Sequence, residues 1–389
     1  MENRLDLKHI PKELLLIMDL LKDNDDRQIS EVRFFDLDWN RFIDLAIHHR
    51  VYSLLYLQLK QIESDAIPST VRKQLAYLYR KNTIKMLFLS AEMQEVSKLF
   101  KIHQIRTLFL KGPVLAQTLY GDISLRTSRD LDILIPIEQL DQAEELLFKR
   151  GYQKEYEINK ALNEWKWRHR HVNYYHPDKQ ITIEIHWRLN TGPAKEPRFN
   201  ELWNRRQDVP SIHDVNMLSD EDLYWYLNTH GSQHGWSRLR WLVDIKQLIH
   251  RDLDWGKVSQ RLKQYGYFHV GGQGLVLVSE LLNGKISNEA ASHLINRRSK
   301  KLAIKSIFYL ESMINIHSLP LPEAVVKYHK RYLIELMSLE QRVLFTLSFL
   351  YPYPDDVKTL PLPKSLHFLY FPLRPFLWAW RKTRKHALS

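Results

Sequence analysis

Two short segments of the chain carry carboxylates in an alternating pattern. In Asp130–Leu134 the acids occupy every second position, so in an extended strand Asp130 and Asp132 share one face while the residues between them point into a core. The segment Ile181–Trp187 repeats the alternation, with isoleucines on one face and Glu184 on the other. If the two strands are neighbours, about 4.8 Å apart, the three carboxylates converge on one point.

Converging carboxylates repel one another unless cations lie between them. Mg²⁺ prefers oxygen ligands and is commonly held by one or two carboxylates together with substrate phosphates. We therefore expect Asp130, Asp132 and Glu184 to be both the metal ligands and the catalytic residues of a magnesium site.

A phosphate-binding turn is expected just upstream of the first acidic strand. Ile105–Leu110 is typical of a strand that ends at Lys111-Gly112, and Pro113 then opens a short helix that closes near Gly121. A strand, a glycine turn and a helix N-terminus together point backbone N–H groups toward an anion. The residues expected to contact a triphosphate are Lys111, Gly112, Arg126, Ser128 and Arg129.

Three of these motifs resemble a known family. Leu110-Lys-Gly112, the segment Arg126–Leu134 and Ile183–Trp187 resemble the bacterial nucleotidyltransferase family that belongs to the DNA polymerase beta-like superfamily. Segments 46–51, 230–236 and 240–244 also look like landmarks of that family. The resemblance implies a small mixed sheet, two Mg²⁺ ions, and transfer of a nucleoside monophosphate from an NTP, with ATP the expected donor, to a hydroxyl or phosphate with release of pyrophosphate.

Under this interpretation Asp130 and Asp132 hold both ions, while Glu184 completes the site of the ion that activates the acceptor and is the candidate general base. Lys111-Gly112 stands where the superfamily usually has Gly-Ser or Gly-Gly. Two alternatives remain: a non-catalytic nucleotide-binding regulator or antitoxin-like protein, and a nucleic-acid-binding module. The second rests on the net charge and on the cations and aromatics of Trp165–His171.

The acceptor side of the cleft is expected after Pro210. His230, His234 and Arg238 are spaced by four, which would place them on one stripe of a helix facing the carboxylates. Histidines at i and i+4 also have the spacing of zinc ligands, but Gly231 stands where a metalloprotease would have its glutamate. The remaining alternative is a pair of hydrogen-bonded core histidines.

Composition limits the class of protein. The 389 residues carry a formal net charge of +12 with a pI of about 9.5, which favours anionic partners such as NTP, nucleic acid or an acidic membrane surface. The chain has no cysteine, which excludes disulfides and thiolate zinc sites. Without an apolar signal segment or membrane-spanning run, we expect a soluble, cytoplasmic protein. The acceptor, the base of the NTP and the oligomeric state are not indicated.

Periodicity predicts an α+β fold. Leucines recur at helical spacing in Pro11–Lys22, Trp39–Leu59 and Pro68–His103, and helical patterns return after Pro210. We therefore divide the chain into an N-terminal helical region (1–103), a nucleotidyltransferase core with a small mixed sheet (104–212) and a C-terminal helical region (213–389). Phe368–Trp380, followed by the basic run Arg381–Lys385, has the composition of an interfacial anchor, but we favour packing of its aromatics on the body.

Overall fold

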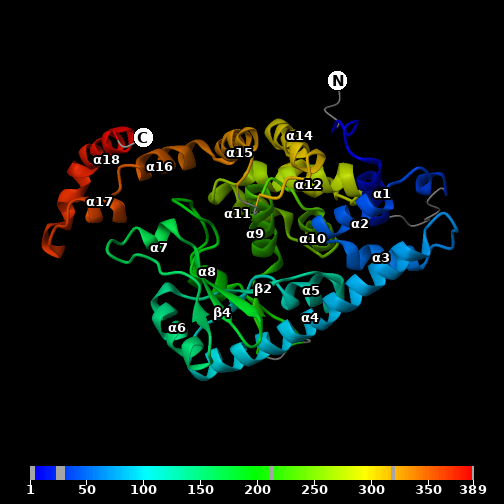
Figure 1. Ribbon diagram of the computed structural model, residues 1–389, viewed down its shortest axis with the longest axis horizontal. Helices are drawn as coiled ribbons and strands as arrows, with labels where there is room; N and C mark the ends of the chain where they lie inside the picture. The colour runs from blue at the N-terminus through cyan, green and yellow to red at the C-terminus, as the bar shows by residue number, and fades with distance from the viewer. Residues whose placement is uncertain (1–4, 23–30, 211, 213, 317–319, 388–389) are drawn as a thin grey trace.

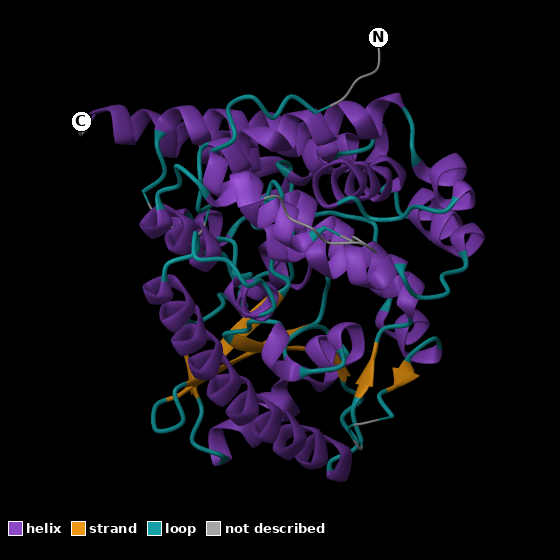
Figure 2. Ribbon diagram, turned by 90° about the vertical axis from the view of Figure 1, so that its right-hand side faces the viewer, coloured by secondary structure: helices purple, strands orange, loops and turns teal. Residues whose placement is uncertain are grey.

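The sheet lies between layers of helices. The computed structural model describes residues 5–22, 31–210, 212, 214–316 and 320–387, and in these ranges it has the α+β architecture that periodicity predicted. The strands of the sheet are β1 Leu108–Phe109, β2 Asp130–Leu134, β3 Gln153–Lys154, β4 His171–His176, β5 Ile181–His186, β6 Gln207–Asp208 and β7 Asn216–Met217. Their order is β3-β4-β5-β2-β1-β7-β6. The strands occupy the lower half of the molecule, with helices above and below them (Figure 2).

Alternation of side chains builds the centre of the sheet. β2 pairs with β5 in parallel and with β1 antiparallel, while β4 pairs with β5 antiparallel. Leu131 and Ile133 on β2, and Ile183 and Ile185 on β5, are completely buried. Because successive side chains of a strand point to opposite faces, this apolar layer fixes which face of each strand carries the acids.

The N-terminal region forms a scaffold beside and below the sheet. Its helices are α1 Lys12–Leu21, α2 Trp39–His48, α3 Tyr52–Lys60 and α4 Ser69–Ile102. α4 runs along the underside of the sheet (Figure 1), where Asn82 donates a hydrogen bond to the backbone of Ser124 and Glu92 accepts one from Tyr152. The continuous helix expected over 39–59 is instead two helices, because Arg50 between them has a positive φ of 57°.

The remaining helices belong to the core and to the C-terminal region. Those within the core are α5 Pro113–Tyr120, α6 Leu140–Lys149, α7 Trp165–Arg168 and α8 Phe199–Asn204. The C-terminal ones are α9 Asp220–Gln233, α10 Leu239–Ile249, α11 Trp255–Gln264, α12 Phe268–Leu282, α13 Asn288–Leu294, α14 Arg297–Glu311, α15 Glu323–Leu336, α16 Leu339–Ser348, α17 Pro354–Thr359 and α18 Tyr370–Ala387.

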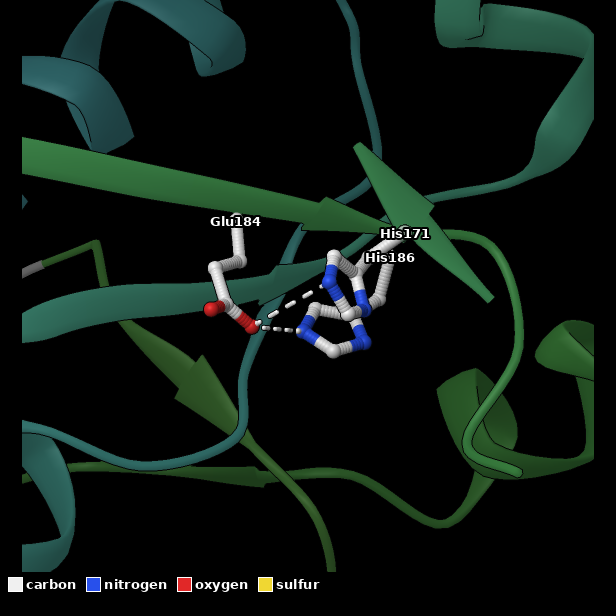
Figure 3. Close-up of side chains that lie close together, drawn as sticks. All are labelled: His171, Glu184 and His186. Carbon is white, nitrogen blue, oxygen red and sulfur yellow. Dashed lines mark ion pairs between the residues drawn. The ribbon is translucent and has the colours of Figure 1, made fainter. Parts of the chain in front are cut away.

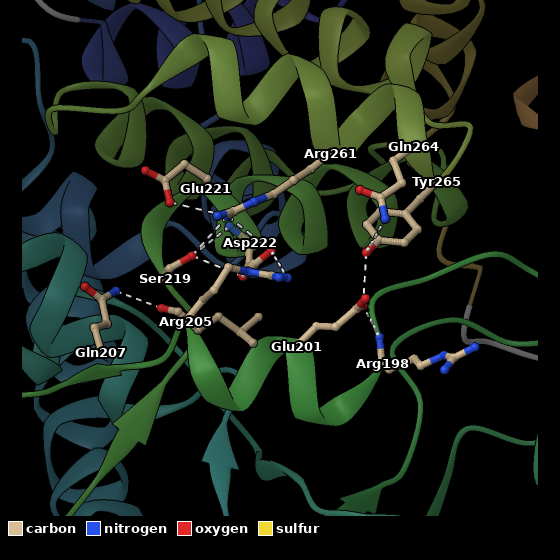
Figure 4. A network of polar contacts seen from close by, with 11 residues as sticks. Arg198, Glu201, Arg205, Gln207, Ser219, Glu221, Asp222, Arg261, Gln264 and Tyr265 are labelled. Carbon is tan, nitrogen blue, oxygen red and sulfur yellow. Dashed lines mark hydrogen bonds and ion pairs between the residues drawn. The ribbon is translucent and has the colours of Figure 1, made fainter.

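An ion-pair network joins the core to the C-terminal helices (Figure 4). Asp222 on α9 is completely buried and accepts hydrogen bonds from Arg205, at the end of α8, over 2.8 and 3.1 Å. Arg261 on α11 lies 3.2 Å from the same carboxylate. Because a buried carboxylate is costly unless it is paired, these contacts fix α9 against the sheet domain.

The helical stripe expected over 230–238 is not formed. α9 ends at Gln233, His234 is its C-cap, and Gly235 and Trp236 have positive φ values of 62° and 56°. A Cβ on Gly235 would lie 2.5 Å from the ring of Tyr309, so the chain turns there on a glycine packed against another helix. Arg238 is consequently the N-cap of α10 and does not continue α9.

The C-terminal arm, residues 339–387 with α16, α17 and α18, extends away from the body at the left of Figure 1. The packing expected for its aromatics is wrong: Phe376 is 72% exposed, Trp378 52% and Trp380 45%. Pro375 lies inside α18 without ending it. Arg381, which was expected to be solvated, instead lies 2.6 Å from the buried carboxylate of Asp356.

Candidate active site

The structure brings the three predicted carboxylates together. In the parallel pairing of β2 with β5, Asp132 lies opposite Glu184, and Asp130 lies two positions earlier on the same face of β2. Asp132 is 1% exposed, while the Glu184 side chain keeps 20% of its surface. Adjacent strands therefore place a buried and a partly open carboxylate side by side.

Two cationic side chains, Lys111 and His186, contact the buried carboxylate of Asp132. Lys111, in the turn after β1, has its Nζ 2.8 Å from Asp132 Oδ1. His186 on β5 has its Nε2 3.4 Å from the same oxygen and 3.3 Å from Glu184 Oε2. Lys111 thus contacts a carboxylate at this site, where the sequence led us to expect a phosphate contact.

These neighbours act on the two aspartates of β2 in opposite directions. Burial alone would raise the pKa of Asp132, but Lys111 and His186 outweigh burial and hold that pKa well below its usual range. Burial raises the pKa of Asp130, and the charges of Asp132 and Glu184 raise it further. Like charges crowded in this way are typical of sites that take a divalent cation.

A second imidazole joins the cluster from β4 (Figure 3). His171 lies directly opposite His186 across the antiparallel pair, and its Nε2 is 3.9 Å from Glu184 Oε2. Burial, with the charge of protonated His186, lowers the pKa of His171 to about 3. Sequence reasoning placed His186 on the polar face of its strand but gave neither histidine a role; their opposite register was the signal that could have found them.

Five cations gather on the side of Asp130. They come from four separate segments of the chain: Arg50, Lys85, Arg129, Arg238 and Arg240. Among the described residues, none of the five lies at ion-pair distance from a carboxylate. Only Arg129 was predicted as a phosphate ligand and Arg238 as an acceptor-side residue, whereas Arg50, Lys85 and Arg240 were missed.

Mutual repulsion marks this group, the cation cluster, as an anion site. Burial and then the charges of Arg238 and Arg129 lower the pKa of Arg50 to about 9. Burial and neighbouring arginines likewise lower the pKa of Arg238 to about 10 and that of Arg240 to about 9. Cations that depress one another's pKa are stabilised by a bound polyanion, because its charge offsets their repulsion.

The prediction that Arg126 contacts a triphosphate is wrong. Its guanidinium is 1% exposed and forms a bidentate ion pair with Asp244 of α10, with contacts of 2.9 and 3.0 Å, and Tyr120 donates to the same carboxylate over 2.7 Å. The residue therefore ties the loop before β2 to α10 instead of facing a phosphate. Nothing in the local sequence reveals a partner 118 positions away.

The other predicted residues of the turn surround Asp130. Ser128 Oγ donates to the backbone oxygen of Asp130 over 3.2 Å and lies 3.4 Å from its carboxylate. Gly112 has φ 78° at the N-cap of α5, a conformation that favours glycine. Both residues shape the loop beside the carboxylates.

His230 and His234 line the far wall, although not as one helical stripe. Their rings are 4.6 Å apart, and His234 stacks on Trp241 at 5.3 Å. Burial, and then the charge of Lys111, hold the pKa of His230 well below its usual value. Their expected role on the acceptor side stays a prediction.

The cations and aromatics of segment 165–171 are largely engaged inside the protein. Trp165 is buried and packs edge-on against Trp187 at 5.4 Å. Arg168 lies between the rings of Trp167 and Tyr353 and donates to the Tyr353 hydroxyl over 2.7 Å. This arrangement does not offer the row of open stacking surfaces that a single-stranded nucleic acid would need.

Comparison with known proteins places the chain in a family. A family model described as "Uncharacterised nucleotidyltransferase" matches residues 36–283. The chain belongs to this nucleotidyltransferase family. The matched segment contains all three carboxylates and the whole cation cluster.

No curated protein matches the sequence. Among solved structures, the crystal structure of JHP933 from Helicobacter pylori is similar at 13% identity, over 67% of this chain and 98% of that chain, with a TM-score of 0.27. No helix within the described ranges is both long and apolar enough to cross a membrane.

This nucleotidyltransferase has a cavity of about 640 Å³ lined by residues of segment 167–170, the end of α9 and helices α15 and α16. Arg170 lies on its wall and donates from Nε to His171 Nδ1 over 3.3 Å, while His234 lines it from the other side. Apolar residues of α15 and α16, among them Leu333 and Phe345, form much of the rest. No carboxylate is found among its described lining residues.

Proposed function

We propose that the protein transfers a nucleoside monophosphate from an NTP to an acceptor hydroxyl or phosphate, with release of pyrophosphate. One observation carries the proposal: three carboxylates converge on adjacent parallel strands, beside five cations that have no carboxylate partner among the described residues. The first group suits divalent cations and the second suits the triphosphate that such cations accompany. Family membership supports transfer of a nucleotidyl group in general.

Asp130, Asp132 and Glu184 are the residues that would hold Mg²⁺. They fit such an ion because all three offer carboxylate oxygens, and the charges of Asp132 and Glu184 are close enough to raise the pKa of Asp130. When bound, a pair of Mg²⁺ ions would polarise the α-phosphate, lower the pKa of the acceptor oxygen and neutralise the leaving pyrophosphate. Lys111 and His186 offset the charge of Asp132 in the protein itself.

The cation cluster would hold the triphosphate. Arg129 is exposed, and Arg50 and Arg238 are near enough for their charges to act on one another's pKa, so the three can contact phosphate oxygens together. We accordingly move Arg238 from the acceptor side to the nucleotide side. Gly112 and Ser128 would shape the loop under the phosphates.

The cavity beside Arg170 and His234 is the proposed acceptor side. Its cationic and apolar wall suits an acceptor with an apolar body and neutral or anionic polar groups, and disfavours a polycationic one. In the transfer, the acceptor oxygen would attack the α-phosphorus, the bond to the bridging oxygen would break, and pyrophosphate would leave. The proton of the acceptor hydroxyl would pass to Glu184 or to water.

The proposal is tested by incubating the full chain with each α-labelled NTP, ATP first, in the presence of Mg²⁺ and a cell extract. We expect one class of molecule in the extract to become labelled, and no label with Asp130→Asn or Asp132→Asn. His176→Ala, on the far end of β4, is the matched control and should label as the wild type does. Equal labelling by wild type and both aspartate variants would contradict the proposal.

A further inference from the structure

Three potential metal ligands lie on one polar face of β4 and β5 (Figure 3). His171 and His186 are direct partners across the antiparallel pair, and Glu184 precedes His186 by two positions, so all three side chains emerge on the same side. A ring nitrogen from each histidine and one Glu184 oxygen all lie within 4.8 Å of one another. The sheet itself, and not a flexible loop, therefore fixes the group.

The separations match those of ligands around one ion. Ligand atoms about 2.0–2.1 Å from a tetrahedral ion lie roughly 3.3–3.4 Å from each other. Glu184 Oε2 lies 3.3 Å from His186 Nε2 and 3.9 Å from His171 Nε2. To bind an ion through Nε2, His171 would have to give up the contact in which its Nδ1 accepts from Arg170 Nε over 3.3 Å, because a metal-bound imidazole carries its proton on the other ring nitrogen.

The ligand types select the kind of ion. Imidazole suits Zn²⁺ and other divalent transition metals, whereas Mg²⁺ takes oxygen ligands. His186 is 2% exposed, and neither of its ring nitrogens makes a hydrogen bond of acceptable geometry among the described residues. Without metal, His186 lies as a cation between Asp132 and Glu184, so a bound ion would replace the proton on its Nε2 and metal binding would release a proton.

We propose that His171, Glu184 and His186 bind a divalent transition-metal ion of the Zn²⁺ type, with a fourth position left open. The inference deepens the proposed function at Glu184 and rests on it for the position of the site. At Glu184 this ion would take the place of the second of the two Mg²⁺ ions, while Asp130 and Asp132 would hold the Mg²⁺ that accompanies the triphosphate. An open position is the usual feature of a catalytic metal site.

The test measures metal binding by the full chain without any nucleotide. The chelator-treated protein is titrated with Co²⁺, followed by its visible absorption, and then with Zn²⁺ in competition. We expect one equivalent of Co²⁺ to bind with the spectrum of a nitrogen- and oxygen-ligated ion and to be displaced by Zn²⁺. His171→Ala and Glu184→Gln should each weaken binding at least tenfold.

Two control variants separate this site from its surroundings. His176→Ala removes a buried histidine from the other end of β4, and Asp130→Asn removes an acid of the magnesium site; both should keep the Co²⁺ affinity of the wild type. Loss of affinity in Asp130→Asn with retention in His171→Ala would overturn the proposal, as would failure of the folded wild type to bind Co²⁺. Failure of nucleotidyl transfer with Co²⁺ binding intact would instead overturn only the proposed function.

A separate observation concerns the C-terminal arm. Tyr370, Arg374 and Leu377 form the inner face of α18, where Arg374 lies 3.2 Å from the buried Asp356. At helical spacing Phe371 and Trp378 flank this inner face on one side and Phe376 and Trp380 flank it on the other, all of them at least 45% exposed. Phe368, just before the helix, is 63% exposed. So many exposed aromatics on one helix are unusual on a protein without a partner.

Positive charge accompanies these aromatics. Lys382 lies over the ring of Trp378 at 5.1 Å, and the sequence continues Arg381-Lys-Thr-Arg-Lys385; the side chains of its last two residues lie outside the described residues. Tryptophan and phenylalanine beside lysine and arginine are the composition of helices that lie in the interface of an anionic membrane. We infer that the exposed aromatic side chains of α18 bind an anionic lipid surface.

Sedimentation with lipid vesicles tests this inference. The full chain should bind vesicles that contain phosphatidylserine, bind neutral phosphatidylcholine vesicles at least tenfold more weakly, and lose binding as salt is raised. Trp378→Ser together with Trp380→Ser should reduce binding at least tenfold. Phe88→Ser, which changes a 67% exposed phenylalanine on α4, is the matched control and should have no effect.

Two results would overturn the membrane inference. One is a folded wild-type chain that binds neither kind of vesicle. The other is a wild-type dimer, seen by analytical ultracentrifugation, that the double tryptophan variant converts to a monomer, because a second copy of the chain would then cover these aromatic side chains.

Discussion

Asp130 and Asp132 stand two positions apart on β2, yet their neighbours act on their charged forms in opposite ways. The pKa of Asp130 is raised, so its ionised form opposes folding at neutral pH; the pKa of Asp132 is lowered, so its ionised form favours folding above the ordinary aspartate pKa. Ionisation of Asp130 therefore lowers the free energy of unfolding and ionisation of Asp132 raises it, although both residues would hold metal.

Substitution by asparagine should separate these effects. Without Mg²⁺ at pH 7, Asp130→Asn should leave the free energy of unfolding equal or higher, whereas Asp132→Asn should lower it by about 1–3 kcal/mol, because Lys111 and His186 lose a charged partner. Urea unfolding of both variants measures this. Both should lack Mg²⁺-dependent turnover. Equal destabilisation by the two substitutions would mean that the cations do not distinguish the carboxylates.

Arg126 and Arg129 provide a second comparison, three positions apart. Arg129→Ala should raise the KM for NTP about tenfold with little change in kcat or in melting temperature, because an exposed phosphate ligand acts in both ground and transition states. Arg126→Ala should instead cost about 3–5 kcal/mol of stability, because Asp244 would be left buried and unpaired. Steady-state kinetics and thermal unfolding distinguish them, and a reversed pattern would refute both assignments.

For single residues, the sequence predicted the features that depend on the alternation of side chains along one strand. The common face of Asp130, Asp132 and Glu184 follows from a two-residue repeat, and neighbouring isoleucines set it. Arg50 and Lys85 were missed because they come from a turn and a helix distant in sequence, and their role depends on tertiary packing. The assignment of Arg126 failed for the same reason, since its partner lies on α10.

At the scale of elements, α12 shows how glycines let helices approach. A Cβ on Gly272 would lie 2.2 Å from the backbone oxygen of Leu294, and one on Gly274 would lie 1.9 Å from Asn228 Oδ1. These glycines therefore serve packing. α12 begins at Phe268 and runs through three glycines, because close packing compensates for the poor helix propensity of glycine.

Gly272→Ala should therefore lower the free energy of unfolding by about 1–3 kcal/mol, because the added methyl group meets backbone that cannot move aside. Gly256→Ala is the matched control: it lies in the first turn of α11, where the new Cβ meets only the Asp254 side chain at 3.3 Å. Chemical denaturation compares the two. If Gly256→Ala lowers the free energy of unfolding as much as Gly272→Ala does, the close contact at Gly272 is not the cause of the loss.

At the scale of the whole molecule, His269 joins two layers of the C-terminal region. It is buried on α12, and its Nε2 lies 2.6 Å from the backbone oxygen of Leu336, the last residue of α15. Burial lowers its pKa to about 4, although this hydrogen bond and nearby arginines also act on it. The residue is thus neutral in the folded protein at a pH where an unfolded histidine is charged.

The sign of the pH effect follows from that shift. A lowered histidine pKa contributes stability above the unfolded value of about 6.5, and this contribution is lost as pH falls toward 4. The stability advantage of the wild type over His269→Phe should therefore be largest at pH 7.5 and smaller at pH 4.5. Urea unfolding of both proteins at the two pH values tests this, and an advantage that grows in acid would contradict it.

The regional boundaries at 103/104 and 212/213 stay predictions, although α4 ends at Ile102. Overall periodicity predicted the helical and sheet regions because each pattern is local. It did not predict that α16–α18 would leave their aromatics exposed, since a sequence gives no sign of whether an apolar face finds a surface to cover it.

The central claim, transfer of a nucleotidyl group, is tested most directly by following two labels in one reaction. The purified chain, Mg²⁺ and a fraction containing the acceptor are incubated with NTP labelled at either the α- or the γ-phosphate, and pyrophosphate is quantified. The account predicts that α-label enters the acceptor in amounts equal to the pyrophosphate released, while γ-label remains entirely in pyrophosphate. Entry of γ-label into the acceptor, without pyrophosphate release, would contradict it by showing phosphoryl transfer instead.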